Sequence, residues 1–185
     1  MQHILKTAIP FAATLILSAC GNNSNPENNA GAAHSHDHAA MEQPQTATTA
    51  NPVLKNDKLN AVYQHYIHLT TALTNGDVAE AKIAANAIEA GSKSINGASG
   101  IASSAEKIMA APDMAAQRTS YSGMSKDIAE LIKKEGLSGG ELYVAFCPMA
   151  LNDKGATWIS GSREIRNPYF GEKMLGCGEV KETIK

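Results

Sequence analysis

Polar and apolar residues alternate with the period of an amphipathic helix from about residue 56 onward. Asn56 and Asp57 offer a helix N-cap at the start of this pattern, and Asn75-Gly76 offers a stop. These signals predict a first helix over residues 57–75. Its apolar stripe consists of Leu59, Val62, Tyr66, Leu69 and Leu73.

Three further helices are predicted before residue 136. Asp77-Val-Ala-Glu80 is an acidic version of a capping box, and Pro112 is suited to the boundary between two helices. Glycine and serine dominate residues 91–100, which indicates a loop there. Short connections favour antiparallel neighbours in an up-and-down four-helix bundle. The predicted segments are residues 78–90, residues 103–109 and a fourth helix that ends at Gly136.

The hydrophobic period changes after Gly140. Leu142, Val144 and Phe146 alternate with other residues as a strand requires, and Thr157–Ser160 is a second short strand candidate. A turn at residues 152–155 would join the two. The expected fold is therefore mainly α: a four-helix bundle with a C-terminal β-hairpin and an irregular glycine-rich segment, forming one domain over residues 53–185.

The first 19 residues have the features of a lipoprotein signal peptide. Lys6 supplies the positive charge, residues 9–17 the apolar stretch, and Leu17-Ser-Ala-Cys20 the cleavage motif. Processing would leave Cys20 as an acylated N-terminus that anchors the protein to a membrane, facing the periplasm. Gly21 stands where some bacteria place an inner-membrane retention Asp, so the outer membrane is expected. The alternative is an ordinary signal peptide with an incidental cysteine.

Residues 20–52 form a predicted disordered tether, because they contain almost no large apolar side chain to repay the entropy of ordering. The tract His34-Ser-His-Asp-His38 lies within it. Its three imidazoles, from His34, His36 and His38, could meet one borderline metal ion such as Cu(II), Ni(II) or Zn(II). The alternative is a solvated polar linker with chance histidines.

Two cysteines and two methionines lie at short spacing near the end of the chain. Pro148 biases Cys147 toward extended backbone, so that Cys147 and Met149 project to the same side. Met174 and Cys177 are three residues apart and would share one face of a helical turn. The sequence therefore predicts two pairs of sulfur ligands.

Thiolate and thioether sulfurs are soft donors, which favour Cu(I) over Zn(II) and exclude hard ions. Other soft or borderline ions are the next candidates. His65, on the first predicted helix, could border the domain interior and is the first candidate for an extra ligand. A copper-binding protein for buffering or delivery is the expectation from these residue types.

A structural disulfide between Cys147 and Cys177 remains the alternative. Once Cys20 is acylated, two of the three cysteines are left in an oxidising compartment, where they can pair with each other in one disulfide. Closing a loop of about 30 residues would contribute about 3.5 kcal/mol to stability. If the disulfide forms, we expect the protein to be an interaction domain of the cell envelope with no metal role.

Charge and motifs narrow the function further. The formal net charge is −2 at pH 7 and no basic stripe occurs, so nucleic acid is not an expected partner. The sequence has no haem-attachment motif, no His-Glu-x-x-His and no glycine-rich phosphate loop. No convincing acid/base pair of carboxylates occurs either. A binding protein is expected rather than an enzyme.

Four motifs lie near the end of the chain: Tyr143–Ala150, Trp158–Ser160, Ile165–Gly171 and Met174–Gly178. They resemble the domain-of-unknown-function 3347 family, which occurs in bacterial envelope lipoproteins and fused to adaptor subunits of heavy-metal efflux pumps. The resemblance implies a helical domain, a role in copper or related metal homeostasis, and an efflux adaptor or copper chaperone as partner. Cys147, Met149, Met174 and Cys177 fall on recurrent sulfur positions of the family.

The Cys147-Pro-Met149 element also looks like the short heavy-metal-binding domains of such pumps. Their following His-Pro is absent, because Ala150-Leu151 stands in that place. The likeness to those short domains is therefore weaker, because the histidine that would add a ligand is missing.

Overall fold

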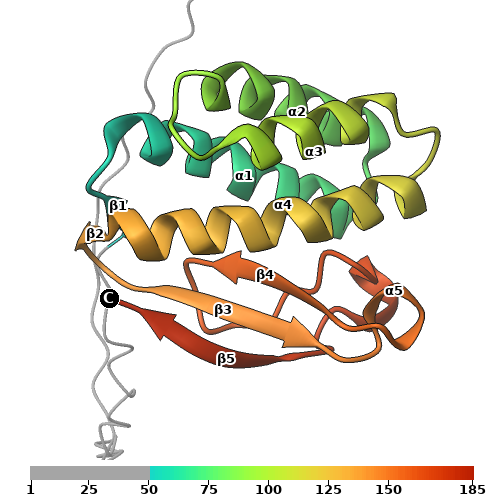
Figure 1. Cartoon of the computed structure of the whole chain (residues 1–185). Coiled ribbons are helices and arrows are strands. Elements are labelled where there is room, and N and C mark those ends of the chain that lie inside the picture. Colours follow the sequence, from blue (N-terminus) through green and yellow to red (C-terminus); the bar gives the residue numbers. More distant parts are fainter. Residues whose placement is uncertain (1–50) are drawn as a thin grey trace, which may run out of the picture. The chain divides into compact units, whose positions relative to one another are not determined.

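The structure is a computed structural model that describes residues 51–185 (Figure 1). The predicted signal peptide, the lipidation site Cys20, the tether up to residue 50 and the tract with His34, His36 and His38 lie outside the described residues. Four long helices come first along the chain and a three-stranded sheet follows. The helices are α1 (Asp57–Asn75), α2 (Val78–Ser92), α3 (Ser99–Ala110) and α4 (Met114–Glu135).

Helix α1 begins and ends where its capping residues predict. The side chain of Asn56 accepts a hydrogen bond from the backbone N–H of Leu59, which is the N-cap geometry. At the other end Gly76 has φ of 75°, a left-handed conformation that glycine adopts without steric cost. Asp77 and Asp113 cap α2 and α4 in the same way as Asn56 caps α1. Local sequence therefore determines these helix boundaries.

Consecutive helices pack against one another, which confirms the predicted helical bundle (Figure 1). The stripe predicted for α1 is buried without exception. Met124 is fully buried, and Met109 and Met114 pack partly buried against the core, as expected of methionines that fill gaps between helices. The bundle is thus held mainly by apolar burial rather than by its few surface ion pairs.

Two helices extend into the segment that was predicted to be a loop. α2 continues to Ser92 and α3 begins at Ser99, four residues before the predicted start. No side chain caps the start of α3, so local sequence gives little signal there. Gly100 instead lies against Asp127 of α4, where a side chain would collide. The first turn of α3 therefore lies close to the side chain of Asp127 on α4.

The hairpin predicted after Gly140 is confirmed. Strands β3 (Leu142–Cys147) and β4 (Ala156–Ser160) are antiparallel, with Cys147 opposite Ala156. Between them lies the short turn α5 (Ala150–Asp153). A further pair, β1 (Val53–Leu54) and β2 (Leu137–Gly139), joins the start of α1 to the end of α4.

The prediction of an irregular segment up to the C-terminus was wrong for its last residues. β5 (Glu179–Ile184) pairs with β3 and completes a sheet in the order β4-β3-β5. Its residues are mostly polar and exposed, and the pairing shifts register between Val144 and Ala145, so the strand has no clean apolar alternation. Only the 3₁₀ turn η1 (Gly171–Met174) interrupts the irregular chain between β4 and β5.

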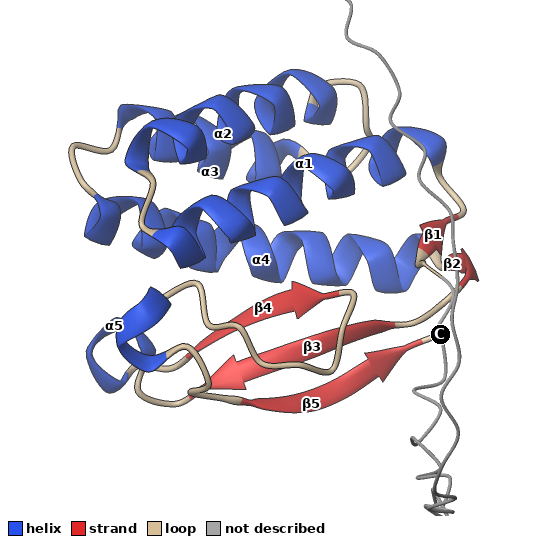
Figure 2. Ribbon diagram, turned by 180° about the vertical axis from the view of Figure 1, so that it is seen from behind, coloured by secondary structure: helices blue, strands red, loops and turns tan. Residues whose placement is uncertain are grey.

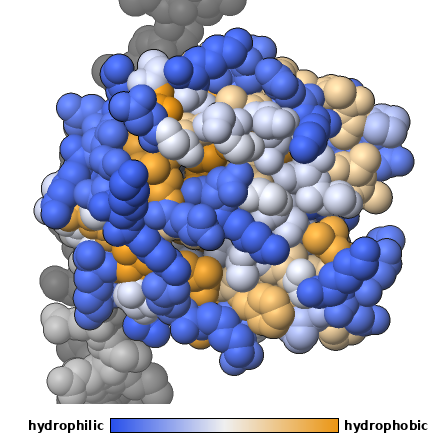
Figure 3. Space-filling model, viewed as in Figure 1, coloured by the Kyte–Doolittle hydropathy of each residue, from blue (hydrophilic) through white to orange (hydrophobic). Residues whose placement is uncertain are grey.

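The sheet lies on one side of the bundle with α4 next to it, as the views from both sides show (Figures 1 and 2). The face seen in Figure 3 carries hydrophilic residues over most of its area, with hydrophobic areas between them. Within residues 51–185, every helix is too short or too polar to cross a lipid bilayer.

Candidate functional site

The cysteines at the ends of β3 and of the long loop before β5 form a disulfide. Cys147 and Cys177 are bonded, and their Cα atoms are 6.0 Å apart, a normal separation for a cystine. Cys147 is fully buried, while Cys177 is only partly buried. The disulfide that the sequence left open as an alternative is therefore present. The expected pair of thiolates is not, because both sulfurs are used in this bond.

The two methionines of the predicted sulfur cluster flank this disulfide and face solvent. Met149 is 46% exposed and Met174 is 36% exposed, and both are among the few large apolar side chains left at the surface. Each lies two or three residues from a bonded cysteine. Both side chains are therefore accessible from solvent.

The chain next to Met149 has an unusual backbone. Leu151, Asn152 and Asp153 in α5 have φ values of 54°, 57° and 63°, so the turn is left-handed. Non-glycine residues lose about 1–2 kcal/mol each in this conformation. Backbone of this kind tends to occur at functional positions, and here it sets the direction in which the chain leaves Met149.

Trp158 and Tyr169 are buried in the core. A side chain at Gly178 would meet the ring of Trp158, so this glycine lets the strand after Cys177 approach the indole. Phe170 is only partly buried. The two bonded cysteines therefore adjoin the aromatic core through Gly178, and each has an exposed methionine within three residues along the chain.

The predicted extra ligand His65 does not lie in a cluster of metal-ligating side chains. Residues 51–185 contain no group of three or more His, Cys, Asp or Glu side chains that could hold an ion. His65 is exposed on α1 rather than at the edge of the interior. His68 Nε2 lies 2.8 Å from Glu80 Oε1 of α2, which links two helices at the surface. The predicted extra ligand His65 thus has no ligand group around it.

Asn167 holds the loop that leads to Cys177. Its side-chain N–H donates to the backbone carbonyl of Cys177 at 2.7 Å, and its Oδ1 accepts from the N–H groups of Tyr169 and Phe170 at 2.7 and 3.2 Å. The backbone N–H of Asn167 also donates to Leu175 O at 2.8 Å. Asn167 is fully buried, so water cannot reach these polar groups and the hydrogen bonds within the protein satisfy them.

Arg118 joins this loop to the helical bundle. Its Nε donates to Pro168 O at 2.7 Å, and its Nη2 donates to Leu73 O near the end of α1 at 2.8 Å. Burial lowers the pKa of the guanidinium, which still carries its charge at neutral pH. Gly171 packs so close to Thr74 O that a Cβ would lie 2.6 Å from it. The loop is therefore docked on the C-terminal end of α1.

A row of aromatic rings crosses the core from the disulfide end toward α1. Successive ring centroids are 5.4 to 6.3 Å apart. Tyr66 and Tyr121 share a hydrogen bond of 2.8 Å between their hydroxyls, and the N–H of Ile159 donates to Tyr66 Oη at 3.0 Å. The row consists of Trp158, Tyr169, Tyr121, Tyr66 and Tyr63.

Stability should fall at alkaline pH because of these phenols. Burial raises the pKa of Tyr63, Tyr66, Tyr121 and Tyr169 above the ordinary value of about 10. The unfolded chain loses these protons at lower pH than the folded one, so the stabilisation is complete below pH 10 and is lost as the pH rises beyond it. Urea unfolding between pH 8 and 11.5 should show a decreasing free energy of unfolding.

Phenolate absorbance near 295 nm provides the internal check. The four buried tyrosines should contribute to it only in step with the loss of folded structure seen by circular dichroism. Full ionisation of all five tyrosines while the far-ultraviolet spectrum stays native would contradict the burial of this row.

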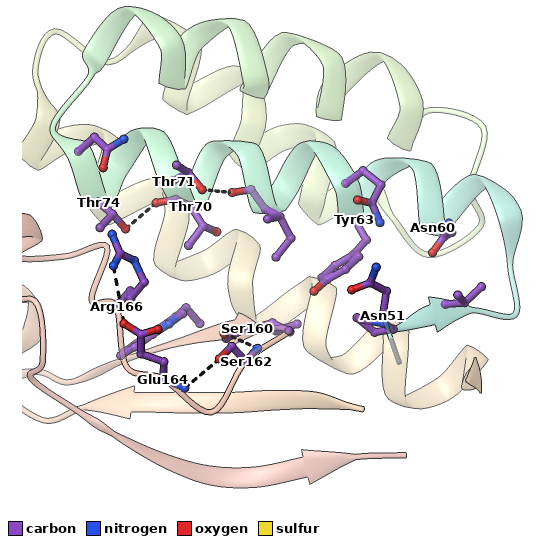
Figure 4. Close-up of a pocket in the computed structure, with 18 residues that line it drawn as sticks. Asn51, Asn60, Tyr63, Thr70, Thr71, Thr74, Ser160, Ser162, Glu164 and Arg166 are labelled. Atoms are coloured by element: carbon purple, nitrogen blue, oxygen red, sulfur yellow. Dashed lines mark hydrogen bonds and ion pairs between the residues drawn. The ribbon is translucent and has the colours of Figure 1, made fainter. Parts of the chain in front are cut away.

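A pocket of about 610 Å³ lies between α1 and the end of β4 (Figure 4). One wall is the polar side of α1, with Gln64 and Thr71, and the other is the chain from Trp158 to Arg166. Sequence reasoning missed it, because its residues come from segments about 90 positions apart and share no motif. The only local signal was the group of serines and charges after β4.

The site therefore combines a cross-link, a fixed loop and a pocket. The disulfide is a stable cross-link, the loop behind it is fixed by Asn167 and Arg118, and the pocket holds a single carboxylate, Glu164, beside the guanidinium of Arg166. The sulfur cluster was expected as four ligands, and it is one disulfide and two thioethers in the oxidised state seen here.

Residues 62–140 match the model of a family described as "Protein of unknown function (DUF3347)". The matched family is the one that the C-terminal motifs resemble. The match spans α1 to β2 and ends before Cys147, so the sulfur positions lie beyond it. Neither the curated proteins nor the solved structures yielded a match to this chain.

Proposed function

We propose that this domain, of which residues 62–140 match the DUF3347 family model, is a disulfide-stapled binding module of the bacterial envelope. The observation that carries the proposal is the bond between Cys147 and Cys177. It ties β3 to the loop that Asn167 and Arg118 hold against the bundle. A rigid loop of this kind is suited to recognition, and disulfides persist in oxidising compartments such as the periplasm.

The proposed location depends on Cys20, which we expect to carry the lipid anchor. Acylation there would also remove the third cysteine from competition for disulfide exchange, leaving Cys147 and Cys177 to pair with each other. Mass spectrometry of the mature N-terminus checks this part alone. An unmodified Cys20 would refute the anchor without affecting the staple.

Thiol counting tests the staple. Protein trapped with an alkylating reagent directly from cells should show no free thiol at Cys147 or Cys177 until a reductant is added. Two alkylated cysteines in protein taken from unstressed cells would exclude a permanent staple and favour a reduced site.

Soft-metal binding is a second candidate function, favoured by the exposure of Met149 and Met174. A dithiol reductant would supply two electrons and two protons to the cystine and would itself become a disulfide. The product is two thiols beside two thioethers, a donor set that suits Cu(I). In this candidate function the protein buffers copper or delivers it to an efflux adaptor or a copper chaperone, and the disulfide form is the state without thiolate ligands.

Competition for Cu(I) against a chromogenic chelator checks this candidate. Reduced protein should take up one equivalent, whereas the disulfide form should compete poorly because it has no thiolates. Replacing Met149 and Met174 together with leucine keeps side-chain size but removes both sulfurs. We expect the affinity of the reduced form to fall by at least tenfold, which corresponds to about 1.4 kcal/mol.

The matched control is the same double variant in its disulfide form. Its weak Cu(I) binding should differ little from that of the oxidised wild type. Equal affinity of the reduced wild type and the reduced double variant would exclude the methionines as ligands. Equal affinity of the oxidised and reduced wild type would exclude the cysteines.

A further inference from the structure

The two cysteines of the disulfide differ in how far solvent can reach them. Cys147 is fully buried. It ends β3, the central strand of the sheet, and pairs with Ala156 of β4. Cys177 is only partly buried and belongs to the loop before β5. One end of the bond therefore lies inside the domain, and the other lies near its surface.

The chain before Cys177 adjoins open space, and the chain after it does not. The N–H of Cys177 donates to the carbonyl of Met174 at 3.0 Å, and Met174 is exposed. A Cβ built on Gly176 would meet no atom within 4 Å. A Cβ built on Gly178 would lie 2.8 Å from the ring of Trp158. A molecule in solution can therefore approach Cys177 from the side of residues 174–176.

This asymmetry decides which sulfur a thiol can attack. A thiolate attacks one sulfur of a disulfide in line with the bond, from the side opposite the sulfur that leaves. Attack on Cys147 would require an approach through the buried interior of the domain. Attack on Cys177 requires an approach from outside, with Cys147 as the leaving sulfur.

We propose that Cys177 is the site at which a dithiol reductant, such as a Cys-x-x-Cys protein, forms a mixed disulfide with this protein. The proposal rests on the disulfide staple proposed above, to which it assigns a site of modification and a class of partner. It also gives a route from the stapled form to the dithiol form that Cu(I) binding would need.

The exchange takes two steps. One thiolate of the reductant bonds to Cys177 Sγ, the bond to Cys147 breaks, and its electron pair leaves with Cys147 Sγ, which takes a proton from water. The second thiolate of the reductant then attacks the reductant sulfur bonded to Cys177. Cys177 leaves and takes a second proton. This protein gains two electrons and two protons, and the reductant becomes a disulfide.

The place of Cys147 makes the second thiol of the reductant necessary. Pairing of β3 with β4 holds Cys147, and Asn167 donates to the carbonyl of Cys177 at 2.7 Å. The released Cys147 sulfur is therefore close enough to attack Cys177 again and expel a reductant that has only one thiol. A monothiol should give a transient adduct on Cys177, whereas a dithiol should complete the reduction.

The test maps each cysteine of the oxidised full-length protein after brief exposure to glutathione. Acid quenching followed by peptide mass spectrometry should find glutathione on Cys177 and a free thiol on Cys147. Dithiothreitol should convert both cysteines to thiols. Cys20 lies in a separate peptide and does not affect the result. Glutathione on Cys147 in equal or greater amount than on Cys177 would overturn the proposal.

Two single-substitution variants form a matched pair for the rates. Cys147→Ala leaves the thiol of Cys177, and Cys177→Ser leaves the thiol of Cys147. Where the far-ultraviolet spectrum is native, glutathione disulfide should modify Cys177 at least about tenfold faster than Cys147, because reactivity follows access to the thiol. In guanidinium chloride the two rates should become similar, since the fold no longer shields Cys147.

Equal rates in the folded variants, or faster modification of Cys147, would overturn the proposal. So would a difference that persists unchanged in the unfolded chains, because the fold would then not be its cause. The mapping of the wild type decides the matter if a variant does not fold. The thiol count in cells tests whether the staple is present, and this mapping tests which sulfur is attacked, so either idea can fail while the other stands.

Discussion

Removing the disulfide is expected to lower the free energy of unfolding by about 3.5 kcal/mol. The variant Cys147→Ala with Cys177→Ser suits the purpose, because the first position is buried and the second is only partly so. The bond closes a loop over a sequence separation of 30 residues. Without it the unfolded chain gains the entropy of that open loop. Single domains are typically stable by only about 5–15 kcal/mol, so the loss should be obvious in urea unfolding.

Wild-type protein unfolded in the presence of a thiol reductant is the control. It should reproduce most of the loss seen in the variant, because both lack the same cross-link. A variant as stable as the oxidised wild type would mean that the loop is held by its hydrogen bonds alone. In that case the hydrogen bonds of Asn167 and Arg118, and not the disulfide, would hold the loop in place.

Replacing Asn167 with alanine is expected to destabilise the domain by about 3 kcal/mol, because it leaves several buried polar groups without partners. The carbonyl of Cys177 and the N–H groups of Tyr169 and Phe170 would all lose the side chain that satisfies them. Urea unfolding monitored by fluorescence of Trp158, the single tryptophan of the chain, measures the effect. The exposed Asn96→Ala is a matched control and should change stability by less than about 0.5 kcal/mol.

Asn167 and the disulfide hold the same loop, so their effects should not add. In the background without cysteines, Asn167→Ala should cost less than in the oxidised wild type, because the loop is already loosened. A double-mutant cycle measures this coupling directly. Strict additivity would mean that the loop near Cys177 keeps its structure when the cystine is absent.

Much of the helical part followed from local signals. Asn56, Asp77 and Gly136 each lie at a helix end where their side chain, or its absence, matches the geometry of that end. The start of α3 and strand β5 did not follow, because neither has a strong signal of its own. α3 begins where Gly100 allows contact with α4, and β5 is a largely polar strand whose partner is β3.

The candidate site was predicted in part. Spacing alone grouped Cys147, Met149, Met174 and Cys177, and the structure brings the two cysteines together. The sequence left the choice between thiolates and a disulfide open, because both use the same residues. The role of Arg118 was missed, because its two backbone acceptors lie 45 and 50 residues away along the chain. No sequence motif indicates these contacts.

By itself, the sequence determined the boundaries of α1 and α4, the start of α2, the β3–β4 hairpin and the grouping of the sulfur residues, because these depend on neighbours within a few positions. The tertiary structure alone decided the cysteine pairing, the third strand and the pocket that Tyr63 enters. Those features depend on distances between segments that are far apart in the chain, and such distances are settled only when the bundle and the sheet pack together.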